Sequence, residues 1–359
     1  MTAVRLVPHK ALRTPFCEMA GIDYPVVQTG MGWVADARLT AATSSAGGLG
    51  IVGASTMNLT EMTAAIDQVL SLTDLPFGVN LRSDAPDVYE RAKVMIDRGV
   101  KVASFALAPT EKLIKSFKDA GLLCVPSIGA RRHAEKVVGW GADAVIVQGS
   151  EAGGHTGGVA TSILIPQVIE AINVPVIAAG GFRDGRGLVA ALAYGAQGVA
   201  MGTRFLVTKE SPVPDQVKQV YLEARPEDTV LTDRIDGHSH RVLRTPFIDR
   251  MIAGGGGVRD LLLAMSSAVN LKRTTGMSLI DMVRQALAAR RQHNYNLRQA
   301  VMAANTPMLL RKTMVDGEVE HGIISGGQVS GLITDAPSVE ELILSVIREA
   351  NMTLESLQA

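Results

Sequence analysis

Eight short, nearly continuous apolar runs recur along the chain, and this repetition restricts the fold more than any other feature of the sequence. Strands that are covered on both faces of a parallel sheet carry such uninterrupted runs. Successive runs start 21 to 31 residues apart, which leaves room for a strand, a loop and a crossover helix in each interval. The runs occupy residues 25–30, 49–54, 76–81, 102–107, 123–128, 144–149, 175–181 and 198–203.

Eight such units predict a (β/α)8 TIM barrel. A doubly wound α/β sheet is the alternative, because strand order cannot be read from sequence. From about Lys209 the rhythm changes to helical patterns and a glycine run at 254–257. We therefore expect a barrel made of residues 1–208 and 331–359, with residues 209–330 inserted after strand eight as a mostly helical substrate or lid domain. The last barrel helix is expected at 337–350, capped by Ser338 with Glu341.

Charge and composition exclude several classes of protein. Lysine plus arginine and aspartate plus glutamate each number 35, whereas nucleic-acid binders that neutralise phosphates carry a basic excess. No apolar run is long enough to span a membrane, and the N-terminus lacks the apolar stretch of a secretory signal. Two cysteines, Cys17 and Cys124, cannot build a disulfide framework. These features predict a cytoplasmic protein without nucleic-acid or membrane partners.

Two neighbouring strands of the predicted barrel end in glycine-rich turns. Barrels often hold a phosphate between these two loops, because glycine lets backbone N–H groups approach an anion. The helix that opens at residues 184–187 is expected to add its N-terminal dipole. Two tight turns that need glycine for a positive φ are the alternative interpretation. The turns contain Ala179, Gly180 and Gly181 after strand seven, and Met201, Gly202 and Thr203 after strand eight.

A histidine flanked by glycines follows strand six. Gly153 and Gly154 precede His155, and they would let a ligand come close to an imidazole suited to proton transfer near neutrality. The alternative is a histidine satisfied by a loop carbonyl. Glu151 in the same loop could act as an acid or base, but we interpret it as a solvated carboxylate.

Strands one and three end in residues suited to a flat ring. Gly30, Met31 and Gly32 follow strand one, and Asn80 ends strand three. The asparagine amide offers a donor and an acceptor to the edge of a heterocycle, although asparagine is also a common turn residue.

Two further patterns are not given a functional role. The G-x-G-x-x-G string at 48–53 overlaps a predicted strand, whereas a dinucleotide fingerprint lies between a strand and a helix. His238 and His240 form a pair without a third ligand at a familiar spacing, so we interpret them as surface residues and predict no metal site.

Several strings together resemble the nitronate monooxygenase (2-nitropropane dioxygenase-like) family of FMN enzymes. They include PVVQTGMGWVAD, AGGLGIVGAS, GADAVIVQGSEAGGHTGG, PVIAAGGFRDGRG and GVAMGTRFLVTKES, between residues 25 and 211. The resemblance implies FMN at the barrel mouth, with its phosphate on Gly180, Gly181, Gly202 and Thr203. Its ring would lie near Met31 and Asn80, with Gln148 and Gln167 as further contacts. His155 matches the family histidine that faces the flavin.

The whole chain is also similar to actinobacterial members of this family that take part in steroid degradation. These members are implied to oxidise a bicyclic (hydrindane) acyl-CoA, with a hydride passing to flavin N5 and His155 acting as base. Basic residues of the insert could then meet the CoA phosphates, although a solvated basic surface is the alternative. These residues are Arg241, Arg244, Lys272 and Arg273.

Three other functions remain open at this stage. One is nitronate oxidation with molecular oxygen, which would use the same flavin and histidine. Another is NAD(P)H-dependent enoyl-thioester reduction, because the family also contains flavin-dependent enoyl-acyl-carrier-protein reductases. The third is a non-catalytic flavin-binding or CoA-binding module. The sequence leaves the oligomeric state open, a homodimer included.

Overall fold

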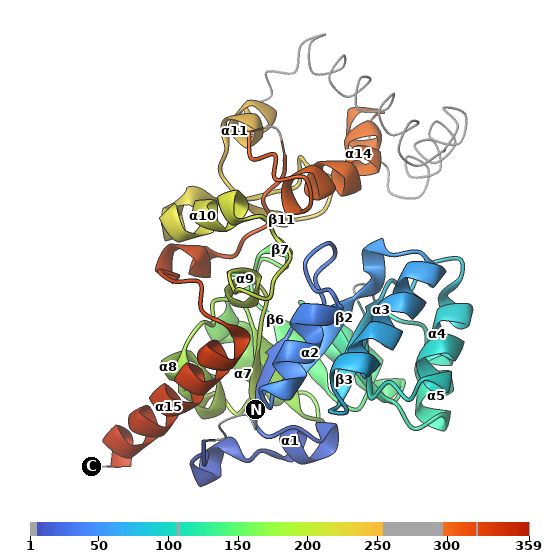
Figure 1. Ribbon diagram of the computed structural model, residues 1–359, viewed down its shortest axis with the longest axis vertical. Coiled ribbons are helices and arrows are strands. Elements are labelled where there is room, and N and C mark those ends of the chain that lie inside the picture. Colours follow the sequence, from blue (N-terminus) through green and yellow to red (C-terminus); the bar gives the residue numbers. More distant parts are fainter. Residues whose placement is uncertain (1–5, 106–107, 254–296, 321, 359) are drawn as a thin grey trace.

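Eight parallel strands close into a barrel, so the TIM-barrel prediction is confirmed and the doubly wound alternative is wrong. The computed structural model describes residues 6–105, 108–253, 297–320 and 322–358. Each predicted apolar run supplies one strand of the barrel (Figure 1). The strands follow the order β1 (Val26–Gln28), β2 (Leu49–Gly53), β3 (Phe77–Leu81), β4 (Val102–Phe105), β5 (Leu123–Ile128), β6 (Val145–Gln148), β8 (Val176–Ala179) and β9 (Gly198–Met201).

Helices connect the strands and cover the outside of the barrel (Figure 1). The connecting helices are α2 (Ala37–Ser45), α3 (Leu59–Leu72), α4 (Val88–Asp97), α5 (Glu111–Asp119), α6 (Arg131–Gly139), α7 (Thr161–Ile169) and α8 (Gly185–Ala193). The final helix, α15 (Val339–Gln358), lies beside α8. It begins with the predicted cap, since the Glu341 N–H donates to Ser338 Oγ and the Ser338 N–H donates to the Glu341 carboxylate.

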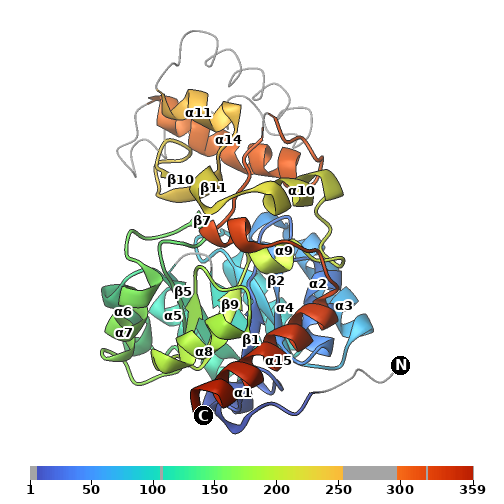
Figure 2. The same ribbon diagram turned by 90° about the vertical axis from the view of Figure 1, so that its left-hand side faces the viewer.

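The narrow interior of the barrel is closed at one end. Helix α1 (Pro15–Ala20) lies beneath the strands (Figure 2), and its Phe16 and Ala20 pack with Ile51, Ile146 and Ile177 in the interior core. Apolar side chains thus fill the N-terminal end of the barrel. Among the described residues, the end of the barrel that is left for a ligand is therefore the opposite rim, where the carboxyl ends of the strands lie.

The segment that follows β9 lies over that rim (Figures 1 and 2). It contains the helices α9 (Thr203–Leu206), α10 (Asp215–Glu223), α11 (Pro246–Ile252) and α14 (Leu297–Met314), and the 3₁₀ turns Pro226–Asp228 and Gln328–Leu332. Two further 3₁₀ turns, Lys10–Leu12 and Ala54–Thr56, belong to the barrel part of the chain. A small separate core packs Ile235, Val242 and Ile248 against Leu309 and Ile323. None of the helices in the described part of the chain has the length and apolarity that crossing a bilayer would need.

A three-stranded antiparallel sheet joins the insert to the barrel, and the sequence did not predict it. Two strands, β10 (Thr229–Thr232) and β11 (His240–Leu243), come from the insert. The third, β7 (Gly154–His155), belongs to the loop after β6, and β11 lies between the other two. The loop that carries His155 is therefore fixed by the insert as well as by the barrel. The glycine run at 254–257 lies outside the described residues.

Candidate active site

Two glycine turns form a concave backbone surface at the rim of the barrel. Gly180 and Gly181 have φ angles of +103° and +81°, which side chains rarely adopt. A Cβ on Gly202 would lie 3.2 Å from Thr29 Oγ1 and 3.3 Å from Met31 Sδ. Gly181 is exposed and Gly180 and Gly202 are half-buried, so an anion can reach the backbone of both turns. The turns therefore fit the phosphate of a cofactor.

The helix after strand seven does not contribute its N-terminus to this surface. The Gly185 N–H donates to the Glu349 carboxylate at 3.0 Å, and a Cβ on Gly185 would lie 2.2 Å from the Ala350 nitrogen. Helix α8 therefore starts against α15, and its dipole is already matched by an acidic side chain. The expectation that this helix faces a phosphate is wrong.

The loops after strands one and three lie against each other. A Cβ on Gly30 would lie only 2.3 Å from Asn80 Cβ, so glycine is required for this contact. Asn80 is buried and donates to Ser104 Oγ at 3.2 Å. Trp33, which the sequence did not single out, has a φ of 65°. Non-glycine residues held in this region are strained and often mark functional loops.

The loop after strand six is held from both sides. The Gln148 side chain donates to the backbone oxygen of His155 at 2.7 Å. On the other side, the Thr156 N–H donates to the Ser239 oxygen at 3.1 Å, and His155 pairs with His240 in the small sheet. The His155 side chain remains 57% exposed. Its backbone is thus fixed while its imidazole stays accessible at the mouth.

An acidic residue of the insert contacts this imidazole. Nε2 of His155 lies 2.7 Å from Oδ2 of Asp236, and the Asp236 side chain is only 11% exposed. Burial alone would raise the pKa of Asp236, but the hydrogen bond from His155 and the neighbouring His240 outweigh it. They hold the pKa of this carboxyl well below its usual range. Asp236 is therefore ionised at neutral pH.

His240 is buried, so its interpretation as a surface residue is wrong. Its side chain is 2% exposed, with Nε2 2.8 Å from Ser325 Oγ and Nδ1 3.9 Å from the Asp236 carboxylate. Within the described part of the chain, that Nδ1 has no hydrogen-bond partner. Burial lowers the pKa of His240, so the imidazole is neutral near pH 7.

The same three side chains include donor atoms that could bind a metal ion. One atom each from His155, Asp236 and His240 lies within 4.8 Å of the others. Two ligands of one tetrahedral zinc ion, each about 2.0–2.1 Å from the metal, are about 3.3 Å apart. The separation of 2.7 Å between His155 and Asp236 is shorter and typical of a charge-assisted hydrogen bond. The geometry therefore favours a histidine–carboxylate pair over a metal centre.

Glu151 is a structural residue rather than a solvated carboxylate. It accepts hydrogen bonds from the Thr161 N–H at 2.9 Å and from the Thr161 hydroxyl at 2.8 Å. Its backbone oxygen accepts the Gln328 N–H. Gly327 lies against Gly153 and donates to Thr203 Oγ1 at 3.2 Å. The segment 325–332 thus joins the loop of strand six to the turn of strand eight.

Several predicted contacts lie away from the mouth. Gln167 is exposed in the middle of α7, in the outer helical layer, so we remove it from the site. The side chain of Met201 packs in the core between strands and helices, and that of Ala179 packs inside the barrel. Only the backbone of these two residues can face a cofactor.

The basic residues expected to meet CoA are mostly occupied. Arg241 is buried and donates to the Ser150 oxygen and to Thr229 Oγ1, so its assignment to a phosphate is wrong. Arg244 is exposed and pairs with Asp249 at 2.9 Å. Lys272 and Arg273 lie outside the described residues.

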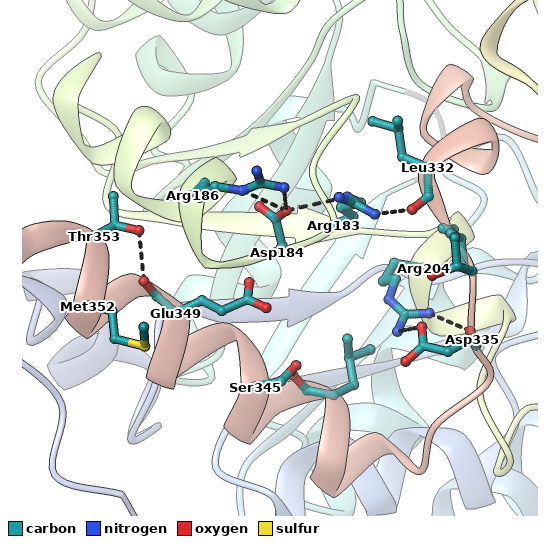
Figure 3. Close-up of a pocket in the computed structure, with 13 residues that line it drawn as sticks. Arg183, Asp184, Arg186, Arg204, Leu332, Asp335, Ser345, Glu349, Met352 and Thr353 are labelled. Carbon is teal, nitrogen blue, oxygen red and sulfur yellow. Dashed lines mark hydrogen bonds and ion pairs between the residues drawn. The ribbon is translucent and has the colours of Figure 1, made fainter.

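A pocket of about 400 Å³ lies between α8 and α15, away from His155 (Figure 3). Three arginines line it, and each has a partner. Arg186 pairs with Asp184, Arg204 pairs with Asp335, and Arg183 donates to the Leu332 carbonyl. Asp184, Asp335 and Glu349 balance the three positive charges. The pocket therefore lacks the excess positive charge that a phosphate-binding site requires.

Comparison with known proteins gives one family. The model of the nitronate monooxygenase family matches residues 13–349. Two curated relatives carry the name (3aS,4S,5R,7aS)-5-hydroxy-7a-methyl-1-oxo-octahydro-1H-indene-4-carboxyl-CoA dehydrogenase. The one from Mycobacterium tuberculosis is 53% identical over 97% of this chain and 99% of its own length, and that from Rhodococcus jostii is 51% identical over 97% and 98%. A probable nitronate monooxygenase of Staphylococcus aureus is 30% identical over 68% of this chain and 81% of its own.

Solved structures agree with the fold over nearly the whole chain. FabK from Thermotoga maritima superposes with a TM-score of 0.78 and 35% identity, covering 96% of this chain and 98% of its own. A nitroalkane oxidase from Streptomyces ansochromogenes gives a TM-score of 0.73 and 25% identity, covering 94% and 99%.

Proposed function

Because the chain belongs to the nitronate monooxygenase family, we propose that it is an FMN-dependent dehydrogenase of a steroid-derived, bicyclic acyl-CoA thioester. One observation carries this choice of substrate. The relatives with more than half of their residues identical align over 97% of the chain, so their similarity extends through the insert, whereas the nitronate monooxygenase relative aligns over 68%. Because the insert covers the mouth, we propose that residues 209–330 determine which substrate binds.

The rim offers suitable positions for each part of FMN. Gly180, Gly181, Gly202 and Thr203 would hold the phosphate, since all four are half-buried or exposed at the rim. The ring would lie along the loop of Gly30 and Met31, beside Asn80, with the Gln148 side chain already directed at the backbone of His155. When bound, FMN would supply the two-electron acceptor of the dehydrogenation.

His155 would accept the proton that the dehydrogenation releases. It is the exposed titratable side chain of the loop after strand six, and Asp236 holds one of its nitrogens. A thioester carbonyl acidifies the neighbouring C–H bond, so a base of moderate strength is sufficient. The substrate would be oriented by the insert above and by the rim below.

We propose a cytoplasmic location from the chemistry of the two cysteines. Both are free and buried, and burial raises the pKa of the Cys124 thiol to about 12. Unpaired thiols of this kind are usual where the environment is reducing.

Nitronate oxidation is the second candidate, because the matching family model carries that name. The two functions can be separated by anaerobic stopped-flow reduction of the holoenzyme. The electron donors are a hydroxylated hydrindane acyl-CoA, propionate-3-nitronate, and NADH or NADPH. We expect the acyl-CoA to bleach the flavin absorbance at least about 100-fold faster than the nitronate does. Faster bleaching by the nitronate would establish the second candidate, and faster bleaching by a nicotinamide would reject both.

Replacement of His155 by Asn tests the assignment of the base. General-base catalysis contributes about 100- to 10,000-fold, so the acyl-CoA-dependent rate should fall by that range while the flavin content stays unchanged. His133→Asn is the matched control, because His133 is exposed on α6. Unchanged acyl-CoA-dependent turnover in His155→Asn would reject His155 as the base, and a protein with bound flavin but no turnover with any of the donors would be a flavin-binding or CoA-binding module.

A further inference from the structure

His155 and Asp236 differ in how exposed their side chains are and in which part of the chain supplies them. His155 is 57% exposed and belongs to the barrel, whereas Asp236 is 11% exposed and belongs to the insert, in the connection between β10 and β11. The residues are 81 positions apart in the sequence, and their contact is 2.7 Å long. A carboxylate of the insert is thus buried directly against the exposed imidazole of the barrel.

This contact determines which nitrogen of the imidazole carries the proton. An ionised carboxylate can only accept hydrogen bonds, so Nε2 of neutral His155 must be the N–H donor. Nδ1 is then the nitrogen with the free electron pair. Asp236 therefore leaves Nδ1 as the atom that can accept a proton from a substrate.

The surroundings of Asp236 keep it in this role. Its Oδ1 accepts the His238 N–H at 3.2 Å, which fixes the carboxylate from its own loop. The buried ring of His240 lies 4.6 Å from the ring of His155, measured between centroids, and its Nε2 is engaged by Ser325. Among the described residues, His155 from β7 and His240 from β11 are the titratable side chains that act on the carboxylate, whereas the exposed ring of His238 lies 5.9 Å from the ring of His155, measured between centroids.

We propose that Asp236 is a positioning residue that completes the catalytic base of the barrel from within the insert. It fixes the tautomer and the orientation of His155, and its negative charge stabilises the imidazolium after proton transfer. This inference rests on the proposed function, in which His155 accepts the proton, and it adds that the base is complete only when the insert is docked.

Replacement of Asp236 by Asn in the holoenzyme tests the proposal. Asn keeps the size of the side chain but removes its charge and can present an N–H to His155. We expect kcat for the acyl-CoA to fall at least about 100-fold with the flavin content and KM nearly unchanged. Asp236→Glu should recover part of the rate. Asp233→Asn, an exposed aspartate of the same connection, should behave like wild type.

The outcomes separate this inference from the proposed function. If His155→Asn abolishes turnover but Asp236→Asn keeps the wild-type kcat, the positioning role is rejected and the proposed function stands. If His155→Asn also keeps its turnover, the assignment of His155 as the base is rejected together with the positioning role of Asp236, and faster flavin bleaching by the nitronate or by a nicotinamide would reject the proposed substrate.

A measurement on the unmodified protein covers the case in which Asp236→Asn fails to fold. Nitrogen NMR of the labelled imidazoles, assigned with His155→Asn, should find the His155 proton on Nε2. A proton on Nδ1 of neutral His155 would overturn the proposal.

Discussion

Gly180 combines a left-handed backbone with close neighbours on the side where a side chain would lie. Its φ is +103°, and a Cβ would lie 2.9 Å from Thr161 Oγ1 and 3.1 Å from the Gly149 oxygen. Gly121 has a φ of +80° but no atom within 4 Å of the same position. Comparing the two glycines therefore distinguishes the cost of backbone strain alone, at Gly121, from strain with steric conflict, at Gly180 in the turn that we propose holds the cofactor phosphate.

Substitution of each by Ala should reveal this difference. Gly121→Ala should lower the free energy of unfolding by about 1–2 kcal/mol, the cost of a left-handed L-residue. Gly180→Ala should lower it further and should release FMN, because the turn must move away from Thr161. Urea unfolding and flavin retention on a desalting column measure the two effects. Equal losses in both variants would contradict the steric conflict at Gly180.

Individual residues were predictable where their role depends on their neighbours in sequence. The glycines around His155 and after strands seven and eight are recognised from their position at strand ends, and the structure brings their loops to one rim. Glu151 and His240 were misread because their partners, Thr161 and Ser325, lie 10 and 85 residues away. A single sequence does not report such pairs.

At the scale of elements, the contact between α8 and α15 depends on Gly185. A Cβ there would meet the Ala350 nitrogen at 2.2 Å and the Val346 oxygen at 2.4 Å. Both are backbone atoms, which cannot rotate away as a side chain can. Closing the barrel with its last helix therefore requires glycine at the start of α8.

Gly185→Ala should separate these helices and lower the free energy of unfolding by about 1–3 kcal/mol, as overpacking does. Gly139→Ala is the matched control, since Gly139 ends α6 with no atom within 4 Å of its Cβ position. Alanine is the better helix former there, by up to about 1 kcal/mol, so this variant should be neutral or more stable. Thermal unfolding of both proteins makes the comparison, and a stable Gly185→Ala variant would contradict the tight contact.

The eight barrel strands were predictable because each carries its own apolar run, with burial on both faces. The small sheet was not predictable for the opposite reason. Strand β7 has two residues, and β10 and β11 have four each, so none of them has a periodic pattern long enough to recognise. Their hydrogen bonds depend on partners that only the tertiary fold brings together.

At the scale of the whole molecule, the buried His240 connects stability to pH. Burial lowers its pKa, whereas the unfolded chain binds a proton at this residue below about pH 6.5. The unfolded state then binds more protons than the folded state, so stability is lost as the pH falls below that value. Asp236 titrates below this window, because its pKa is lowered.

We therefore expect the free energy of unfolding to decrease between pH 7.5 and pH 5.5, as measured by urea unfolding at both values. His240→Gln should lose part of this decrease, because it has no group that the unfolded chain can protonate. His133→Gln should retain all of it, since His133 is exposed. The same slope in wild type and His240→Gln would show that another group is responsible.

The order in which a ribosome makes this chain has a consequence for the two-residue strand β7. All eight barrel strands have been synthesised once Met201 is in place, but the partner of β7 is β11, at His240–Leu243. In a nascent chain, all eight strands thus exist while the loop with His155 still lacks its neighbour. In the role that we propose for His155, the base is therefore completed only after all strands of the barrel have been synthesised.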